Sequence, residues 1–449
     1  MRHITTPRLL AAFALTLAAG CDRTLTVEPV NEVEEKSAIV DAVSARAALS
    51  GLYDALQSDG NNYAYYAGSY LYFTELPSDN IEHTGTFTSY ADADAYVTTA
   101  DNSEVESVWD DIYSSIGRAN TLIAKIPSVA QLEESERNDI IGQAYLVRAL
   151  GYHNLVRMFG GVPIRTEPTT SISELGNIER ATVDQVYTQI LDDLNKAASL
   201  LSDEFRTLRG SLGAVEALRS RILLYKQDWA GTEAAADAVL DMGYELAPVF
   251  SDLFDAEGKD TPEDIWKVAF TAVEYNLVGY YYLSQRVGGR REIAPTEDLV
   301  NAFEPEDIRL AWTISTDNRG RLYGSKIPTP VGAEDIHIIR LGEVLLNKAE
   351  AQARQGKLSE AVDTYNLLRE RAGVPLHVFG SDVSTEDEVL SAIWLERRRE
   401  LALEGDRFFD LVRTGRAVDV LGMPATRELF PIPQNEIDVA PKLVQNPGY

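Results

Sequence analysis

The sequence predicts a mostly α-helical protein in which stacked helical hairpins support long irregular loops. Three observations predict this fold: apolar residues recur at helical spacing over most of the chain after Ala42, a helix–turn–helix unit occurs twice, and two aromatic-rich stretches without that spacing interrupt the helices. The chain has 449 residues, 45% of them hydrophobic, which is enough to bury a large core. We expect one large domain or two interlocked ones.

The repeated unit covers Leu212–Gly243 and Leu341–Gly373. Both copies open with Leu-Gly-x-Val, place apolar residues on one face of each helix and end at glycine. A helical pair of about 34 residues is the tetratricopeptide period, although antiparallel hairpins without repeat ancestry would look similar. Two further pairs bring the expected number of hairpins to about four: Asn138–Met158 with Val183–Leu201, and Ala42–Gln57 with Val105–Ile126.

Two stretches combine many aromatic residues with Gly, Ser, Asn and Pro. The first is a loop insertion at 59–100, and the second covers 244–339. Long ordered loops on a rigid scaffold often carry function. We therefore place the ligand-binding face here, with some of the tyrosines packing the loops onto the helices instead.

The N-terminus has the features of a lipoprotein signal. Arg2 and Arg8 precede an apolar run that is too short to span a bilayer, and small residues lead directly to Cys21. Cys21 is the only cysteine, so the chain has no disulfide to form. We expect residues 1–20 to be the signal peptide and 21–40 to be a lipidated tether; an ordinary secretory signal with an incidental cysteine is the alternative.

The net charge of −29 disfavours nucleic acid and anionic lipid headgroups as partners, because the dominant Coulomb term is repulsive. The sequence contains none of the common nucleophile, phosphate-loop or His-Glu-x-x-His motifs. A glycoside hydrolase needs only two carboxylates, and 70 acidic residues leave that alternative open. We expect a binding protein with no catalytic residues, no cofactor and no metal ligands.

Binding of a sugar requires aromatic rings for the C–H faces and polar groups for the hydroxyls. The two aromatic stretches supply both kinds of residue. The candidates for ring stacking are Tyr90, Tyr96, Tyr280 and Trp312, and those for hydrogen bonding are Asp79 and Asn80. In contrast, Arg148, Arg397 and Glu404 lie in helical segments, where we expect ion pairs of the scaffold. Gly405 is expected to end the preceding helix, and Asp406 to cap the next one.

Several strings are more specific than composition explains. They occur in this order: Trp109-Asp-Asp-Ile-Tyr113, Arg148-Ala-Leu-Gly-Tyr152, Arg340-Leu-Gly-Glu343, Glu396-Arg-Arg-Arg-Glu400, Arg407-Phe-Phe-Asp410, Phe430-Pro-Ile-Pro433 and the final Asn446-Pro-Gly-Tyr449. Together they resemble the SusD/RagB family of outer-membrane nutrient-binding lipoproteins, over essentially the whole mature chain.

The resemblance implies an N-terminal SusD-like helical region at 41–243, a ligand-binding region at 244–339 and a C-terminal RagB/SusD region at 340–449. It also implies an outer-membrane protein, lipid-anchored and facing the cell exterior, that delivers oligosaccharides to a SusC-like TonB-dependent transporter. Capture of peptides, as in RagB-like members, is the nearest alternative. A protein-interaction scaffold is a third, since tetratricopeptide arrays usually bind proteins.

Overall fold

The computed structural model describes residues 39–58, 63–169, 178–254 and 259–449. The predicted signal peptide, Cys21 and all but the end of the tether lie outside the described residues. The described chain is mostly helical, with short strands that form three two-stranded sheets. The predicted mostly α-helical fold class is therefore confirmed, and the tetratricopeptide-like character of the hairpins stays a prediction.

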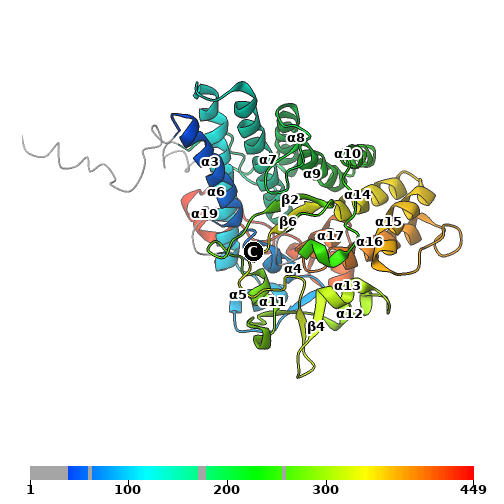
Figure 1. Ribbon diagram of the computed structural model, residues 1–449. Helices are drawn as coiled ribbons and strands as arrows, with labels where there is room; N and C mark the ends of the chain where they lie inside the picture. Colours follow the sequence, from blue (N-terminus) through cyan, green and yellow to red (C-terminus); the bar gives the residue numbers. More distant parts are fainter. Residues whose placement is uncertain (1–38, 59–62, 170–177, 255–258) are drawn as a thin grey trace, which may run out of the picture.

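The long helices pack side by side in consecutive pairs. The pairs within the described residues are α3 (Ala42–Gln57) with α6 (Ser103–Lys125), α7 (Glu134–Phe159) with α8 (Val183–Leu200), α9 (Leu212–Tyr225) with α10 (Trp229–Asp241), and α14 (Leu341–Arg354) with α15 (Leu358–Ala372), beside which α16 (Glu386–Glu400) lies. Neighbouring pairs also touch, through α6 and α7, α8 and α9, and α10 and α14. The result is a continuous array from α3 to α16 (Figure 1), and every predicted pairing is present.

Local chemistry accounts for the ends of these helices. Asp41 accepts a hydrogen bond from the Ser44 N–H at the start of α3, and the Ser44 hydroxyl is hydrogen-bonded to the Asp41 N–H in return, which forms a capping box. Thr182 and Thr385 begin α8 and α16 in the same way. At the C-terminal end of α15, Gly373 adopts φ +73°, the left-handed conformation that glycine adopts without strain.

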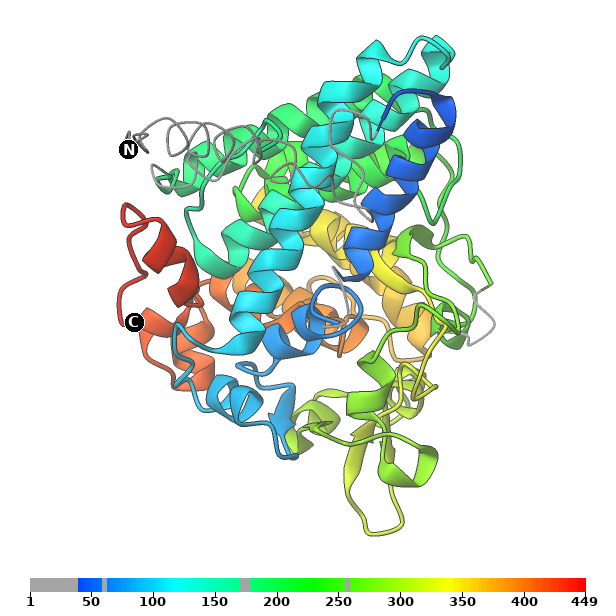
Figure 2. The same cartoon turned by 90° about the vertical axis from the view of Figure 1, so that its left-hand side faces the viewer.

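The two predicted loop stretches contain more regular structure than their composition indicates. They fold into short elements whose bounds are α4 (Ser69–Glu75), β1 (Ile81–His83), α5 (Thr88–Asp94), η3 (Phe250–Phe254), β2 (Asp264–Val268), α11 (Val278–Tyr282), η4 (Gln285–Val287), β3 (Ile293–Pro295), α12 (Glu297–Ala302), α13 (Ile308–Thr313), β4 (Ile314–Thr316), β5 (Leu322–Gly324) and β6 (Ile336–Arg340). Segments of three to seven residues are too short to produce a clear apolar period. Most of these elements lie below the helical array, where the β4–β5 hairpin projects (Figures 1 and 2).

Strand pairing joins the two insertions. β1 of the first insertion pairs antiparallel with β3 of the second, with Ile81 opposite Pro295 and His83 opposite Ile293. A second antiparallel pair, β2 and β6, leads directly into α14. The two stretches predicted to bind ligand therefore form one continuous face.

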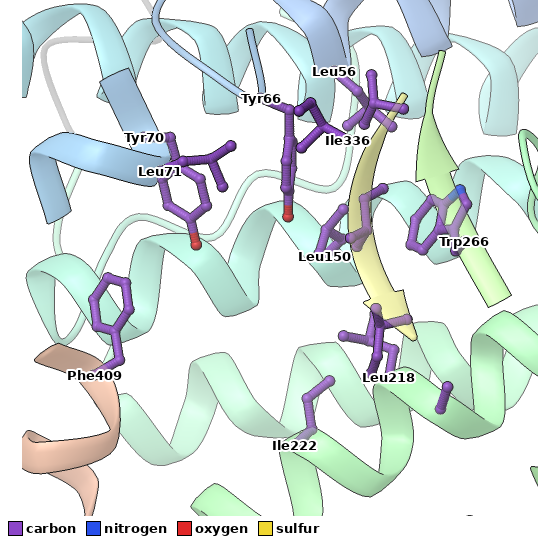
Figure 3. Packing of buried hydrophobic residues seen from close by; sticks show 14 of the residues in the cluster. Leu56, Tyr66, Tyr70, Leu71, Leu150, Leu218, Ile222, Trp266, Ile336 and Phe409 are labelled. Carbon is purple, nitrogen blue, oxygen red and sulfur yellow. The ribbon is translucent and has the colours of Figure 1, made fainter. Parts of the chain in front are cut away.

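One large cluster of buried apolar side chains extends through the described chain from Ile39 to Ile432. Figure 3 shows part of this cluster, to which Leu150 of α7, Leu218 of α9, Trp266 of β2 and Ile336 of β6 all belong. All four side chains are at most 5% exposed. Because this cluster takes residues from helices and insertions alike, the core holds the two insertions onto the helical scaffold.

The predicted scaffold ion pairs are confirmed. Arg148 pairs with Asp193 at 2.7 Å, and Arg397 pairs with Asp406 at 2.7 Å. Glu404 accepts hydrogen bonds from Lys326 at 2.6 Å and from the Arg340 guanidinium at 2.8 Å. Burial alone would raise the pKa of Glu404, but these two cations lower it to about 2.

The predicted N-cap position of Asp406 is confirmed, whereas the predicted role of Gly405 is wrong. α16 already ends at Glu400, so a turn separates it from Gly405. Asp406 occupies the N-cap position of α17 (Arg407–Arg413), but its carboxylate makes no capping hydrogen bond, because it binds Arg397 instead.

The remaining helices are η1 (Ile126–Ser128), α18 (Ala417–Leu421), η5 (Ala425–Arg427) and α19 (Gln434–Val439). Among the described residues, no helix has the length and apolar character needed to cross a membrane.

Candidate functional site

The two residues predicted to bind sugar hydroxyls are occupied by internal contacts. Asp79 accepts two hydrogen bonds from Arg407, at 2.7 and 2.8 Å. Asn80 is fully buried; its amide donates to Glu75 at 2.8 Å and accepts from Arg398 at 2.8 Å. In this structure both residues connect the first insertion to the α16–α17 region, and their role in ligand binding stays a prediction.

The predicted stacking residues of the first insertion differ in accessibility. Tyr90 is 2% exposed, and its ring packs against those of Phe87 and Tyr281, with centroids 5.3 and 6.1 Å away. Tyr96 is half-buried at φ +59°, and burial followed by the charges of Asp94 and Asp79 raises its pKa. Tyr90 therefore supports neighbouring rings, while Tyr96 retains some exposed surface.

The predicted stacking residues of the second insertion lie in different places. Tyr280 on α11 is half-buried and packs edge-to-face on Tyr281 at 5.3 Å. Trp312 on α13 is 53% exposed. Within the described residues, the Trp312 ring has no recorded stacking contact with Tyr90 or Tyr280. The structure thus brings Tyr90 and Tyr280 together through Tyr281 and leaves Trp312 apart.

Half-buried aromatic rings lie near the junction of the two insertions in two groups, one in which Tyr63 contacts Tyr275 and one in which Tyr281 contacts Tyr280 and Phe87. We call these five rings together the aromatic row. Tyr63 stacks on Tyr275 with centroids 5.4 Å apart and an interplanar angle of 25°. A hydrogen bond to Tyr275, burial and the nearby Tyr281 together raise the pKa of Tyr63 to about 12. Tyr63 therefore remains uncharged at neutral pH.

The backbone of α11 fixes the second half of the row. The Leu277 N–H donates to the Ala67 carbonyl at 2.8 Å, which ties the start of α11 to the first insertion. A Cβ at Gly279 would lie 2.1 Å from the Thr329 carbonyl oxygen, so only glycine fits at this crossing. These contacts hold Tyr280 and Tyr281 at the surface in a fixed orientation.

A polar pocket of about 350 Å³ adjoins the aromatic row. Its lining includes Thr84, Thr86, Gln285, Arg290, Arg291 and Arg321. The pocket and the row are connected directly, because the Arg290 guanidinium lies 4.1 Å from the centroid of the Phe87 ring. Apolar faces and convergent polar groups together are the combination that small polar ligands require.

Glu292 is the buried carboxylate of this pocket, and its side chain is 1% exposed. One oxygen accepts from the N–H groups of Thr86 and Phe87, both at 2.6 Å, and the other accepts from Arg290 at 2.5 Å. Burial raises the pKa of Glu292, but these hydrogen bonds outweigh burial and hold the pKa below its usual range. Glu292 is therefore a fixed anion that orders the pocket wall.

A second cavity of about 370 Å³ lies between α6 and α19. Its wall is mainly apolar and includes Tyr113, with the carboxylates of Asp110 and Glu436 at one side. Burial, reinforced by Glu436, raises the pKa of Asp110 to about 6. Trp109 lines this cavity but is 2% exposed, so it offers little ring face. The aromatic row has the more accessible rings and is the stronger candidate site.

The described residues contain no group of three or more His, Cys, Asp or Glu side chains placed to hold a metal ion. Sequence reasoning identified the two insertions and Tyr280 but not the other members of the aromatic row. Tyr275 and Tyr281 belong to the same aromatic-rich stretch, so the signal for them was present. Which rings stay accessible depends on tertiary packing.

The helical array and the site built at the junction of its insertions define a binding protein with a helical scaffold. Two family models match the chain, one described as starch-binding and associating with the outer membrane (residues 31–224) and one described as the SusD family (residues 321–427). The chain belongs to the SusD/RagB family.

Relatives match along the whole chain. A SusD-like protein of Formosa agariphila is 26% identical, with 98% of each chain covered. The starch-binding protein SusD of Bacteroides thetaiotaomicron is 30% identical over 213 residues, which are 44% of this chain and 34% of that protein. A solved laminarin-binding SusD-like protein superposes with a TM-score of 0.80 at 27% identity, covering 92% of this chain and all of the other.

Proposed function

We propose that this protein is a lipid-anchored binding protein of the cell surface that captures oligosaccharides and delivers them to a SusC-like TonB-dependent transporter. The observation that carries the proposal is the aromatic row beside the polar pocket. Sugar rings present C–H faces that pack on tyrosine rings, and their hydroxyls require hydrogen-bonding groups at the ring edges. The aromatic row supplies the ring faces, and the polar pocket supplies the hydrogen-bonding groups.

The comparisons support a carbohydrate as the ligand. The family model over residues 31–224 is described as starch-binding, and a structure that superposes over nine tenths of the chain is that of a laminarin-binding protein. Each of those ligands is a glucose polymer, so their recognition depends on ring faces and hydroxyls. The same chemistry is available at the aromatic row.

We propose binding rather than catalysis at this site. A glycosidase needs one carboxyl group that is protonated and able to donate to the leaving oxygen. Glu292 is instead held as an anion, since its hydrogen-bonding partners lower its pKa. Its two oxygens are already occupied by the backbone and by Arg290, which leaves Glu292 as a structural group.

Calorimetric titration of the full mature chain against neutral and acidic oligosaccharides and against peptides tests the proposal. We expect binding to at least one oligosaccharide and loss of that binding in Tyr280→Ala. Phe205→Ala serves as the control, because Phe205 is an exposed aromatic residue that packs on Tyr244 rather than on the aromatic row. Binding of peptides alone, or turnover of a saccharide, would overturn the proposed function.

Anchoring and delivery are tested separately. Cys21→Ser removes the thiol that would take lipid, so we expect the variant to leave the membrane fraction and appear in the soluble fraction. Purification of the wild-type protein from mild-detergent extracts is expected to bring a TonB-dependent transporter with it. Retention of Cys21→Ser in the outer membrane would contradict the lipid anchor.

A further inference from the structure

Arginines gather around the pocket next to the aromatic row, although the chain as a whole carries a net charge of −29. Arg290, Arg291 and Arg321 all line this pocket, which we call the arginine pocket. On so acidic a protein, a concave site lined by three arginines is an electrostatic exception.

Two of the arginines are neutralised. Glu292 binds Arg290 at 2.5 Å, and Asp317 binds Arg321 through both Nε and Nη2, at 2.9 and 2.7 Å. Both carboxylates also accept backbone N–H groups, those of Thr86 and Phe87 for Glu292 and those of Arg319 and Arg321 for Asp317. Their oxygens are therefore occupied and do not extend to a third guanidinium.

Arg291 is the third arginine of the pocket. Its Nε donates to the Leu322 carbonyl at 2.7 Å, and among the described residues the guanidinium has no recorded ion pair. Burial and the charge of Arg321 lower the pKa of Arg291, while Glu82 and Asp317 raise it by a smaller amount. Arginine stays protonated despite such shifts. The remaining N–H groups of Arg291 are thus available to a ligand in the pocket.

The backbone at Arg291 is also unusual. Its φ is +51°, in the left-handed region that residues other than glycine rarely adopt. The neighbouring chain maintains it, because the Arg291 N–H donates to the Leu283 carbonyl at 2.9 Å and the Glu292 N–H donates to the Tyr281 carbonyl at 2.9 Å. The same segment that carries the aromatic row therefore holds Arg291 at the pocket.

We propose that the arginine pocket receives an anionic group, a carboxylate or a sulfate, carried by a sugar of the bound oligosaccharide. This inference rests on the proposed function and specifies its ligand as an acidic glycan. A guanidinium binds such oxyanions through two parallel N–H groups. The Phe87 ring lies against Arg290, so the aromatic row begins beside the pocket. When the acidic group of one sugar enters the pocket, the next sugar of the oligosaccharide can pack on the aromatic row.

The test uses the full mature protein and three probes of similar length: a neutral β-glucan trisaccharide, an oligogalacturonate and a sulfated galactan oligosaccharide. Arg291→Asn removes the guanidinium while tolerating the left-handed backbone. Arg319→Asn is the matched control, because Arg319 is exposed in the β4–β5 loop and does not line the pocket. Melting temperatures of both variants verify that the fold is retained.

We expect the wild-type protein to bind the galacturonate or the sulfated probe more tightly than the neutral one, and the difference to shrink at high ionic strength. Arg291→Asn should weaken binding of the acidic probe about tenfold or more, and Arg319→Asn about twofold or less. The acidic probe that binds identifies the group as carboxylate or sulfate. Preferential binding of the neutral probe, unaffected by Arg291→Asn, would overturn the inference and leave the proposed function intact. Binding of no saccharide would overturn both.

Discussion

Arg148 on α7 and Asp193 on α8 form a doubly hydrogen-bonded ion pair, with N–O distances of 2.8 and 2.7 Å, between side chains that are 3% and 0% exposed. Arg148 also donates to the Asn120 amide oxygen on α6 at 2.7 Å. Three consecutive helices of the array are therefore joined at one buried guanidinium. Ions in such a position depend on each other, because neither is solvated when its partner is removed.

Arg148→Met is expected to lower the free energy of unfolding by about 3–5 kcal/mol, because it leaves the Asp193 carboxylate buried without a cation. The double variant Arg148→Met/Asp193→Leu should recover most of that loss, since it removes both charges. Urea unfolding followed by circular dichroism measures both values. A loss below about 1 kcal/mol in the single variant would show that the pair contributes little.

Tyr280→Ala is expected to weaken oligosaccharide binding about tenfold, because it removes one ring face of the aromatic row. Trp312→Ala should have no effect on a trisaccharide and a measurable effect on longer chains, since the Trp312 ring is 53% exposed outside the row. Titration with a short and a long oligosaccharide distinguishes the two variants. Equal losses on the short ligand would place Trp312 in the same subsite as Tyr280.

His153 makes the stability of the scaffold pH-dependent. It is fully buried, and burial followed by the charges of Arg157 and Arg221 lowers its pKa well below the usual value. The unfolded chain therefore takes up a proton below about pH 6.5 that the folded chain does not, so stability is complete above that pH and falls by roughly 1.4 kcal/mol per pH unit below it.

His153→Leu removes this titration and should flatten the wild-type decrease between about pH 6.5 and 5. Thermal unfolding of the two proteins in parallel over this range isolates the contribution of His153, because all other titrating groups are shared. Parallel curves for the variant and the wild type would mean that His153 is protonated in the folded state.

Gly405→Ala is expected to destabilise the protein by more than Gly415→Ala. Both glycines have positive φ, +80° and +69°, so each substitution incurs a backbone penalty of roughly 1–2 kcal/mol. A Cβ at Gly405 would in addition lie 2.8 Å from the Leu71 carbonyl oxygen, whereas nothing lies within 4 Å of one at Gly415. Differential scanning calorimetry gives the comparison, and equal melting temperatures would show that the Leu71 segment adjusts.

The helical array could be predicted because its signal is local. Repeated Leu-Gly-x-Val openings and helical apolar spacing identify each pair, and the packing of α9 on α10 and of α14 on α15 follows from short connections. The site depends on contacts between distant residues. Asp79 meets Arg407, more than 300 positions along the chain, and no local pattern indicates that pairing.

The tyrosines show the same limit within one class of residue. Tyr90 and Tyr280 both occur in polar, aromatic-rich segments, yet one is 2% exposed and the other is half-buried at the surface. The difference arises because Phe87 and Tyr281 cover the Tyr90 ring. Composition identified the region that carries the rings, and packing decided which ring faces remain accessible.

The shared core has a consequence for how such proteins diversify. Leu150 and Leu218 lie within the segment matched by one family model, and they belong to the same buried cluster as Ile336, which lies in the segment matched by the other. Recombination that exchanged one of these segments between distant relatives would mismatch the interior, so the scaffold is expected to be inherited as a unit. Exposed side chains such as that of Trp312 take no part in that interior, so substitutions at such positions are not constrained by it. The exposed surface can therefore change in evolution while the buried framework is kept.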